Sequence, residues 1–137
     1  MKKQIGIILV LICMLALTAC GSNKKIVLPK PDQITEIEIM KSTSESDMKI
    51  IEQDKISKII SAIKENTNNT GKESTNDQPT NIDEYITIKF NHENAEGSPS
   101  IAYLYKNKNI CYVEQPYSGI WELSEEVFNS ISSDLTK

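Results

Sequence analysis

Cys111 and His92 are of the residue types that nucleophilic catalysis uses. A cysteine nucleophile needs a base within hydrogen-bond reach and usually a third group that orients that base. His92 is the only histidine and lies in a polar connection before a neighbouring predicted strand, so the spacing allows contact. Cys111, however, lies inside a predicted strand, with no flanking glycine or helix N-terminus to lower its pKa. We therefore favour a buried or half-buried thiol and a surface histidine, and keep a thiol-dependent enzyme as the less favoured alternative.

Patterns that bind metals or phosphates are missing from the sequence. With one histidine and one cysteine left in the expected mature chain, no zinc site with the usual ligand spacing can be assembled. Glu73, Asn76 and Asp77 carry oxygen atoms, but their spacing does not match an EF-hand loop. There is no glycine-rich phosphate loop, nucleophile elbow or zincin motif. We expect no metal, no cofactor and no enzymatic activity.

Residues 114–121 read EQPYSGIW and combine a charge, an amide, two large aromatic side chains, a proline and a glycine. Aromatic side chains beside restricted backbone are typical of recognition surfaces, because they offer contact area at low entropic cost. The alternative is a structural corner, with Tyr117 and Trp121 packed over the end of a sheet. The candidate recognition residues of this segment and of an upstream polar segment are Asn76, Asp77, Glu114, Gln115, Tyr117 and Trp121.

The N-terminal residues have the order of a secretory leader. Lys2 and Lys3 precede an apolar run over residues 5–16, and small residues lead into Cys20. The run is too short for a transmembrane helix, which needs about 20 apolar residues. The tetrapeptide LTAC at residues 17–20 resembles the bacterial lipobox, in which the cysteine thiol receives a diacylglyceryl group. We expect a lipoprotein signal peptide at 1–19, lipidation of Cys20, a solvated tether at 20–33 and one domain at 34–137. An ordinary signal peptide with an incidental cysteine is the alternative.

The mature chain expected from this leader is acidic and lacks internal cross-links. Removal of residues 1–19 leaves 13 lysines, no arginine and 19 acidic residues, a net charge of −6. A net charge of this sign does not favour a long-range attraction to nucleic acid. Cys13 leaves with the leader and Cys20 is expected to be acylated, so Cys111 has no partner for an internal disulfide.

The hydrophobic pattern indicates two helices. Asp54 is the expected N-cap of the first, which should end near Asn66. Ser124 should cap the second, with two glutamates in its first turn. The apolar residues at helical spacing are Ile56, Ile59, Ile60 and Ile63 in the first helix and Val127, Phe128, Ile131 and Leu135 in the second.

Alternating apolar and polar residues predict five or six strands, at 34–40, 48–52, 85–90, 101–105, 110–114 and 120–123. Residues 66–81 hold no large apolar residue and are expected to form a loop. At 115–119 the ladder should break, because Pro116 lacks an amide donor and Gly119 tolerates a positive φ. Strands that follow one another as hairpins favour an antiparallel sheet. We predict an α+β fold with a single antiparallel sheet and two helices packed on one face.

Four features give the chain a resemblance to an uncharacterised family of small lipoproteins from low-GC Gram-positive bacteria. They are Leu28-Pro29, the helix start at Asp54, the loop 74–79 (STNDQP) and the segment 114–120 (EQPYSGI). Trp121 stands where the family pattern favours tyrosine. The resemblance extends over most of the mature chain and brings no catalytic residue. The family that it points to also includes extracytoplasmic parts of sensor-like membrane proteins. It implies that segments 74–79 and 114–120 meet at one end of the sheet, with a buried Asn76 or Asp77 side chain bonding the backbone near Tyr117.

The sequence as a whole predicts a lipid-anchored protein on the extracytoplasmic face of the cell membrane that acts as a non-enzymatic binding or sensing module. Its partner would be an unknown protein or small molecule, and no nucleic acid is expected. The alternative is a surface inhibitor or immunity-type protein directed against a peptidase or toxin. A thiol-dependent enzyme using Cys111 is the third possibility.

Overall fold

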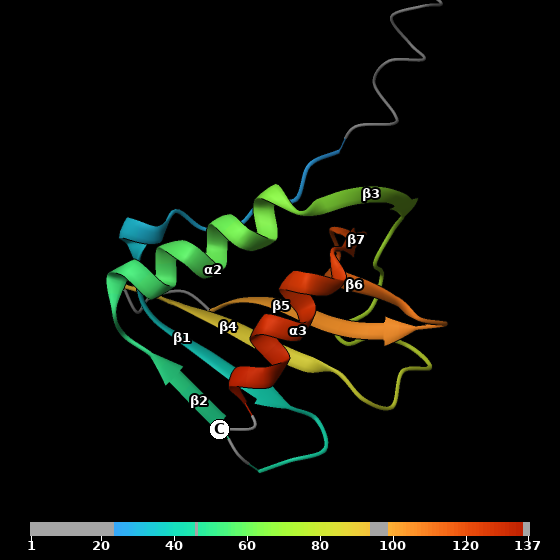
Figure 1. Ribbon diagram of the computed structural model, residues 1–137. Coiled ribbons are helices and arrows are strands. Elements are labelled where there is room, and N and C mark those ends of the chain that lie inside the picture. Colours follow the sequence, from blue (N-terminus) through green and yellow to red (C-terminus); the bar gives the residue numbers. More distant parts are fainter. Residues whose placement is uncertain (1–23, 46, 94–98, 136–137) are drawn as a thin grey trace, which may run out of the picture.

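The computed structural model describes residues 24–45, 47–93 and 99–135. Within these residues, ten elements follow one another (Figure 1). They are η1 (Pro31–Gln33), β1 (Ile34–Lys41), β2 (Asp47–Ile50), α2 (Gln53–Glu65), β3 (Thr67–Lys72), β4 (Ile86–His92), β5 (Ser100–Asn107), β6 (Ile110–Gln115), β7 (Gly119–Leu123) and α3 (Glu125–Asp134).

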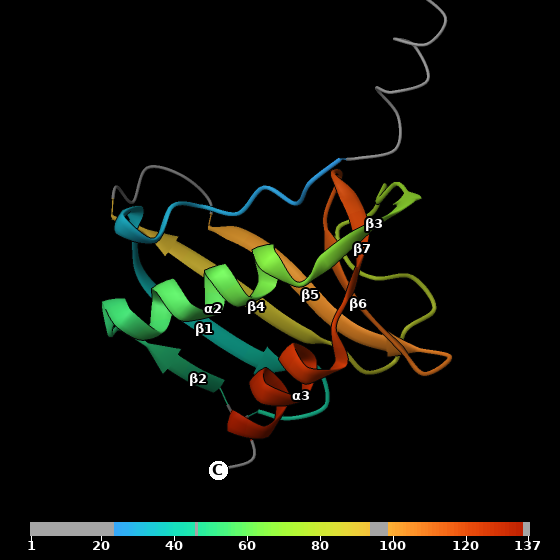
Figure 2. The same ribbon diagram turned by 45° about the horizontal axis from the view of Figure 1, so that its top comes forward.

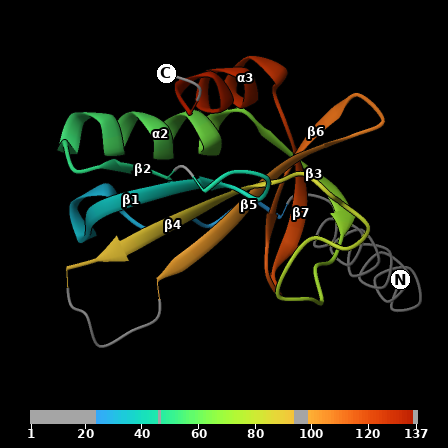
Figure 3. The ribbon, with the colours of Figure 1, turned by 90° about the horizontal axis from the view of Figure 1, so that it is seen from below.

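The seven strands of the described residues form one antiparallel sheet in the order β2-β1-β4-β5-β6-β7-β3. Both helices lie over the same face of this sheet (Figure 3). The predicted α+β class, the single antiparallel sheet and the placement of the helices are confirmed. The strand count is seven rather than five or six, and β3 is the strand that the sequence did not predict.

β3 lies within residues 66–81, which were expected to be a loop, so that expectation was wrong for Thr67–Lys72. The strand has the sequence TNNTGK and no large apolar side chain. It forms because β7 offers it a backbone ladder, in which Thr67 pairs with Leu123 and Asn69 with Trp121. The register shifts between Asn69 and Lys72, and Gly71 has a φ of +75°. A polar edge strand of this kind has no periodicity in its own sequence, because its stability comes from its partner.

The core lies between the sheet and the helices. Ile37 and Ile39 on β1 point toward the helices, while Glu36 and Glu38 alternate with them toward the other face. α2 buries Ile56, Ile60 and Ile63, as its apolar spacing predicted, and α3 buries Ile131.

The ends of the two helices differ in how well the sequence predicted them. Ser124 is the N-cap of α3, and its side chain accepts a hydrogen bond from the Val127 amide at 3.4 Å, as predicted. The predicted cap of α2 was wrong: Glu52 occupies the N-cap position without a side-chain hydrogen bond, and Asp54 lies in the first turn. There its negative charge still interacts favourably with the positive end of the helix dipole.

Residues 24–30, which we call the N-terminal strap, belong to the folded domain. Ile26 and Leu28 are 4% and 6% exposed and join the hydrophobic core. Figure 2 shows the strap running from the β7 end of the molecule to η1. The expectation of a solvated tether up to residue 33 is therefore wrong for this segment, because two apolar side chains and several backbone contacts hold it against the sheet.

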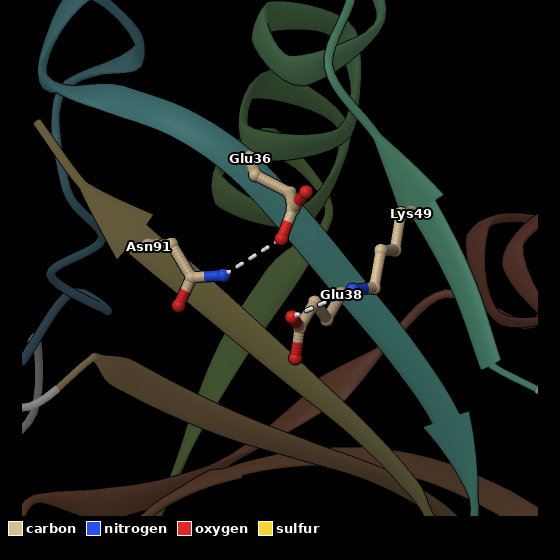
Figure 4. A network of polar contacts seen from close by, with 4 residues as sticks. All are labelled: Glu36, Glu38, Lys49 and Asn91. Carbon is tan, nitrogen blue, oxygen red and sulfur yellow. Dashed lines mark hydrogen bonds and ion pairs between the residues drawn. The ribbon is translucent and has the colours of Figure 1, made fainter.

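The sheet face opposite the helices is divided into two halves. Over β1, β2 and β4 it carries a polar network, in which Asn91 donates to Glu36 Oε1 at 3.1 Å and Lys49 pairs with Glu38 at 3.7 Å (Figure 4). Over β5 and β6 it carries tyrosines, and residues 73–85 cover them. Tyr85 from this connection packs edge-on against Tyr103, with ring centroids 5.4 Å apart.

Candidate functional site

The two polar segments that the sequence singled out come together through a buried carboxylate. Glu114 on β6 is 4% exposed. Its Oε1 accepts a hydrogen bond from Ser74 Oγ at 2.6 Å and its Oε2 accepts one from Tyr105 Oη at 3.0 Å. Burial and the hydrogen bond to Glu114 raise the pKa of the Tyr105 phenol well above its usual range. Both oxygens of Glu114 are thus satisfied, and the carboxylate fastens the 73–85 connection to the sheet.

A second contact joins the segments at the surface. Tyr117 Oη donates to Asp77 Oδ1 at 2.7 Å, and this hydrogen bond raises the pKa of Tyr117. Asn76 is exposed and its amide donates to Thr80 Oγ1 at 3.3 Å. The predicted meeting of segments 74–79 and 114–120 is therefore confirmed. The predicted contact was wrong in detail, since Asp77 is exposed and binds the Tyr117 hydroxyl rather than backbone.

The turn between β6 and β7 is shaped by Tyr117 and Gly119 in roles that the sequence assigned differently. Tyr117 adopts a φ of +59°, whereas Gly119 does not have a positive φ. Gly119 is required for space, because a Cβ there would lie 2.9 Å from Trp121 Cη2. The glycine therefore leaves room for the indole ring to pack against the turn.

Trp121 is buried at 1% exposure and serves the core. Its indole Nε1 donates to the Lys24 carbonyl oxygen at 2.9 Å, and Gln115 Nε2 donates to the Val27 carbonyl oxygen at 2.8 Å. The six candidate recognition residues therefore divide by exposure. Glu114 and Trp121 are buried, Gln115 is half-buried, and Asn76, Asp77 and Tyr117 are exposed.

Cys111 and His92 are far apart in the sheet. Cys111 on β6 pairs with Lys106 of β5, while His92 on β4 contacts Ser100 Oγ at the other end of β5, at 2.9 Å. The six residue-to-residue steps from Ser100 to Lys106 along β5 span about 20 Å. Burial raises the pKa of the Cys111 thiol, although Lys106 partly offsets this. The nucleophile and base considered from the sequence are not brought together.

An open groove lies between α2 and α3, above β1 and β2, and sequence reasoning did not predict it. Its volume is about 1120 Å³. Its apolar residues are Ile39, Met48, Ile50, Ile59, Ala62, Val127, Ile131 and Leu135, and its charged residues are Asp47, Lys49, Lys55, Lys58, Glu126 and Asp134. Several of the apolar residues belong to predicted helix stripes. The gap between the helices depends on how they pack, for which the sequence carries no local signal.

β2 forms one wall of this groove and one edge of the sheet. In the described part of the chain, no strand pairs with its outer side. Met48 and Ile50 are half-buried toward the groove, and Ile51, which follows, is 68% exposed. The groove thus combines apolar side chains with an edge strand.

Neither a metal cluster nor a membrane span is present among the described residues. No group of three or more histidine, cysteine, aspartate or glutamate side chains is placed to hold a metal ion there. None of the helices in those residues is long and apolar enough to cross a membrane. The predicted lipidation site, Cys20, and the signal peptide lie outside the described residues.

Comparisons with known proteins give a family and one solved structure. The sequence profile of DUF5301, described as a domain of unknown function (DUF5300), matches residues 22–122. The NMR structure of a protein from Ruminococcus gnavus is similar to this chain, with a TM-score of 0.61 and 27% sequence identity over 76% of this chain and 99% of that one. The comparison with curated proteins gave no match.

Proposed function

The chain belongs to the DUF5301 family of domains of unknown function, and from that premise we propose that it is an extracytoplasmic lipoprotein that binds a ligand without catalysing a reaction. The leader, with LTAC at 17–20, supports anchoring through a diacylated Cys20 to the membrane of a low-GC Gram-positive bacterium. Two acyl chains give stable anchoring where one does not.

The groove between α2, α3 and β2 is the observation that carries the binding role. Apolar concave sites with a few polar groups at their rim are the usual places where proteins hold ligands. Here the volume of about 1120 Å³ is bordered by lysines from α2 and by acidic residues from α3. A ligand with apolar side chains and charges of both signs would match this lining.

The ligand that we propose for this groove is an extended peptide segment of a partner protein. An extended peptide can add to an exposed sheet edge through main-chain hydrogen bonds, while alternate side chains enter a neighbouring pocket. β2 offers such an edge, and Met48 and Ile50 lie where those side chains would pack. A sensor and a surface inhibitor of a peptidase or toxin would both use this mode, and the identity of the partner separates them.

Anchoring is tested in the native host with the full gene. We expect mass spectrometry to find a diacylglyceryl group on Cys20, and Cys20→Ala to release the protein from the membrane fraction. An unmodified thiol on a membrane-free protein would overturn the anchoring.

Peptide binding is tested by selecting peptides from a displayed random library on the mature chain and mapping them by NMR. Selected peptides should shift the amide signals of β2, α2 and α3. Ile59→Glu should abolish those shifts, whereas Ile110→Glu, a change at a 40% exposed site outside the groove lining, should leave them intact. Shifts confined to residues 74–79 and 115–119 would overturn the groove as the site.

A further inference from the structure

Lys24, the first residue that the structure describes, is held by three hydrogen bonds. Its carbonyl oxygen accepts hydrogen bonds from Trp121 Nε1 at 2.9 Å and from Asn69 Nδ2 at 2.8 Å. Its side-chain Nζ donates to the Ser118 carbonyl oxygen at 2.5 Å. Contacts to β3, to β7 and to the turn before β7 therefore hold this residue.

Lys24 lies only four residues after Cys20. Four residues of fully extended chain span at most about 14 Å. If Cys20 carries acyl chains in the outer leaflet, as in the proposed function on which this inference rests, Lys24 cannot be farther than that from the acylated residue. The headgroup region alone is roughly 5–8 Å thick. The end of the domain around Lys24 must therefore lie close to the bilayer surface.

The residues at this end suit a lipid surface. Tyr117 is 68% exposed beside Ser118, and amphipathic aromatic side chains are enriched at membrane interfaces. Lys24, Lys25 and Lys72 are exposed. A basic residue near an anionic surface gains about 1 kcal/mol. Asp77 shares this end, and its Oδ1 accepts the Tyr117 hydroxyl.

We infer that the end of the domain formed by Lys24, Lys25, Lys72 and Tyr117 rests on anionic lipid headgroups, with the α2–α3–β2 groove turned away from the bilayer. β3 and β2 are the two outermost strands of the sheet. Six interstrand spacings of about 4.8 Å separate them by roughly 29 Å. The anchored end therefore lies at the β3 edge of the sheet and the β2 wall of the groove at the other edge, which leaves that wall open to a partner outside the membrane.

The orientation is tested with the full-length protein, lipidated in a Gram-positive host and reconstituted in vesicles of phosphatidylcholine and phosphatidylglycerol. In a Cys111→Ser background, a fluorophore is attached at Tyr117→Cys or at Ile51→Cys. These two sites are matched, because both wild-type side chains are 68% exposed. Asp77→Cys provides a second reporter in case the Tyr117 variant does not fold. A headgroup-attached quencher should quench the label at 117 or 77 at least twofold more than the label at 51.

Charge reversal tests the role of the lysines. Lys25→Glu with Lys72→Glu should reduce the excess quenching at 117 several-fold, whereas Lys58→Glu with Lys64→Glu on α2 should not change it. Vesicles of phosphatidylcholine alone should also reduce the excess.

Vesicle flotation distinguishes a failure of the proposed lipid anchor from a failure of the proposed orientation. A protein that floats with vesicles while sites 117 and 51 are quenched equally keeps its anchor and overturns this orientation. Preferential quenching that is insensitive to the lysines and to lipid charge would overturn the role of anionic headgroups. A protein that does not float would overturn the lipid anchor itself, and the orientation with it.

Discussion

The two edges of the sheet differ in how strongly they are protected against pairing with another chain. β3 at one edge is polar, carries a register shift between Asn69 and Lys72, and is tied to the N-terminal strap by Asn69. β2 at the other edge has four residues, two of them apolar and turned toward the groove. On the sheet face opposite the helices, Lys49 of β2 forms an ion pair with Glu38 of β1. Bulges and charged side chains are the usual devices that keep an edge strand from pairing with another chain.

The β3 edge is therefore closed by contacts within the fold, whereas the β2 edge is left available for pairing with another chain. The β3 edge takes part in the contacts that hold Lys24 and Trp121, so changes there should affect the free energy of unfolding. The β2 edge has few contacts to lose, so changes there should affect association with other chains.

The largest effect is expected from Trp121→Ala at the closed edge. The substitution leaves a cavity and deprives the Lys24 carbonyl oxygen of the indole donor. Truncation of a buried large aromatic side chain costs about 3–5 kcal/mol. Urea unfolding followed by circular dichroism measures the loss. A cost below about 1 kcal/mol would mean that the strap and β7 are not packed as described.

The next effect is a coupling between Gly119 and Trp121. Gly119→Ala places a Cβ 2.9 Å from Trp121 Cη2, and overpacking of this kind costs about 1–3 kcal/mol. In a Trp121→Phe background the smaller ring removes the clash, so the cost of Gly119→Ala should fall. Gly71→Ala is the control, because its cost comes from the positive φ of 75° with no atom within 4 Å. Urea unfolding of the single and double variants should show an equal cost for Gly71→Ala in both backgrounds.

Lys49→Val at the open edge should have a smaller effect on the free energy of unfolding, but it should increase self-association. An exposed ion pair contributes about 0–1 kcal/mol, so the free energy of unfolding should change little. Without the charge, β2 should pair with a second copy more readily than in the wild-type chain. Sedimentation velocity at increasing concentration measures this association. Asn68→Val on β3 is the matched control, and equal association of both variants would contradict the difference between the edges.

The smallest effect concerns alkaline pH. The pKa of Tyr105 is raised in the folded protein by burial and by its hydrogen bond to Glu114, whereas an unfolded tyrosine titrates near 10. The stabilisation is complete below pH 10. Above it the unfolded state binds fewer protons, so the free energy of unfolding falls as pH rises. Chemical unfolding between pH 8 and 11 should show this slope, and Tyr105→Phe should make it shallower.

The parts of the fold that the sequence predicted are those whose signal is local. The alternation around Ile37, the apolar spacing of α2 and the cap at Ser124 each depend on residues within one turn or one strand. β3 was not predicted, because a polar edge strand depends on β7. The strap was not predicted either, because Ile26 and Leu28 alone between lysines and prolines show no periodicity.

For the candidate site, the sequence predicted which two segments meet, but it did not predict how their side chains are placed. The meeting of segments 74–79 and 114–120 was expected, yet the exposure of Asp77 and the burial of Glu114 depend on how residues 73–85 cross the tyrosine face. The groove depends on the spacing of α2 and α3, whose apolar stripes are about 70 residues apart in sequence. The gap between the helices therefore leaves no pattern in the sequence of either helix.

The contact between Lys24 and Trp121 also sets an order on folding. The two residues are 97 positions apart, and the chain is synthesised from its N-terminus. The Lys24 carbonyl oxygen is made early but meets its indole donor only when β7 has been completed. Because a closure over so many residues is slow compared with local helix formation, docking of the strap should be a late step, and a chain that ends before β7 would lack the indole donor that holds Lys24.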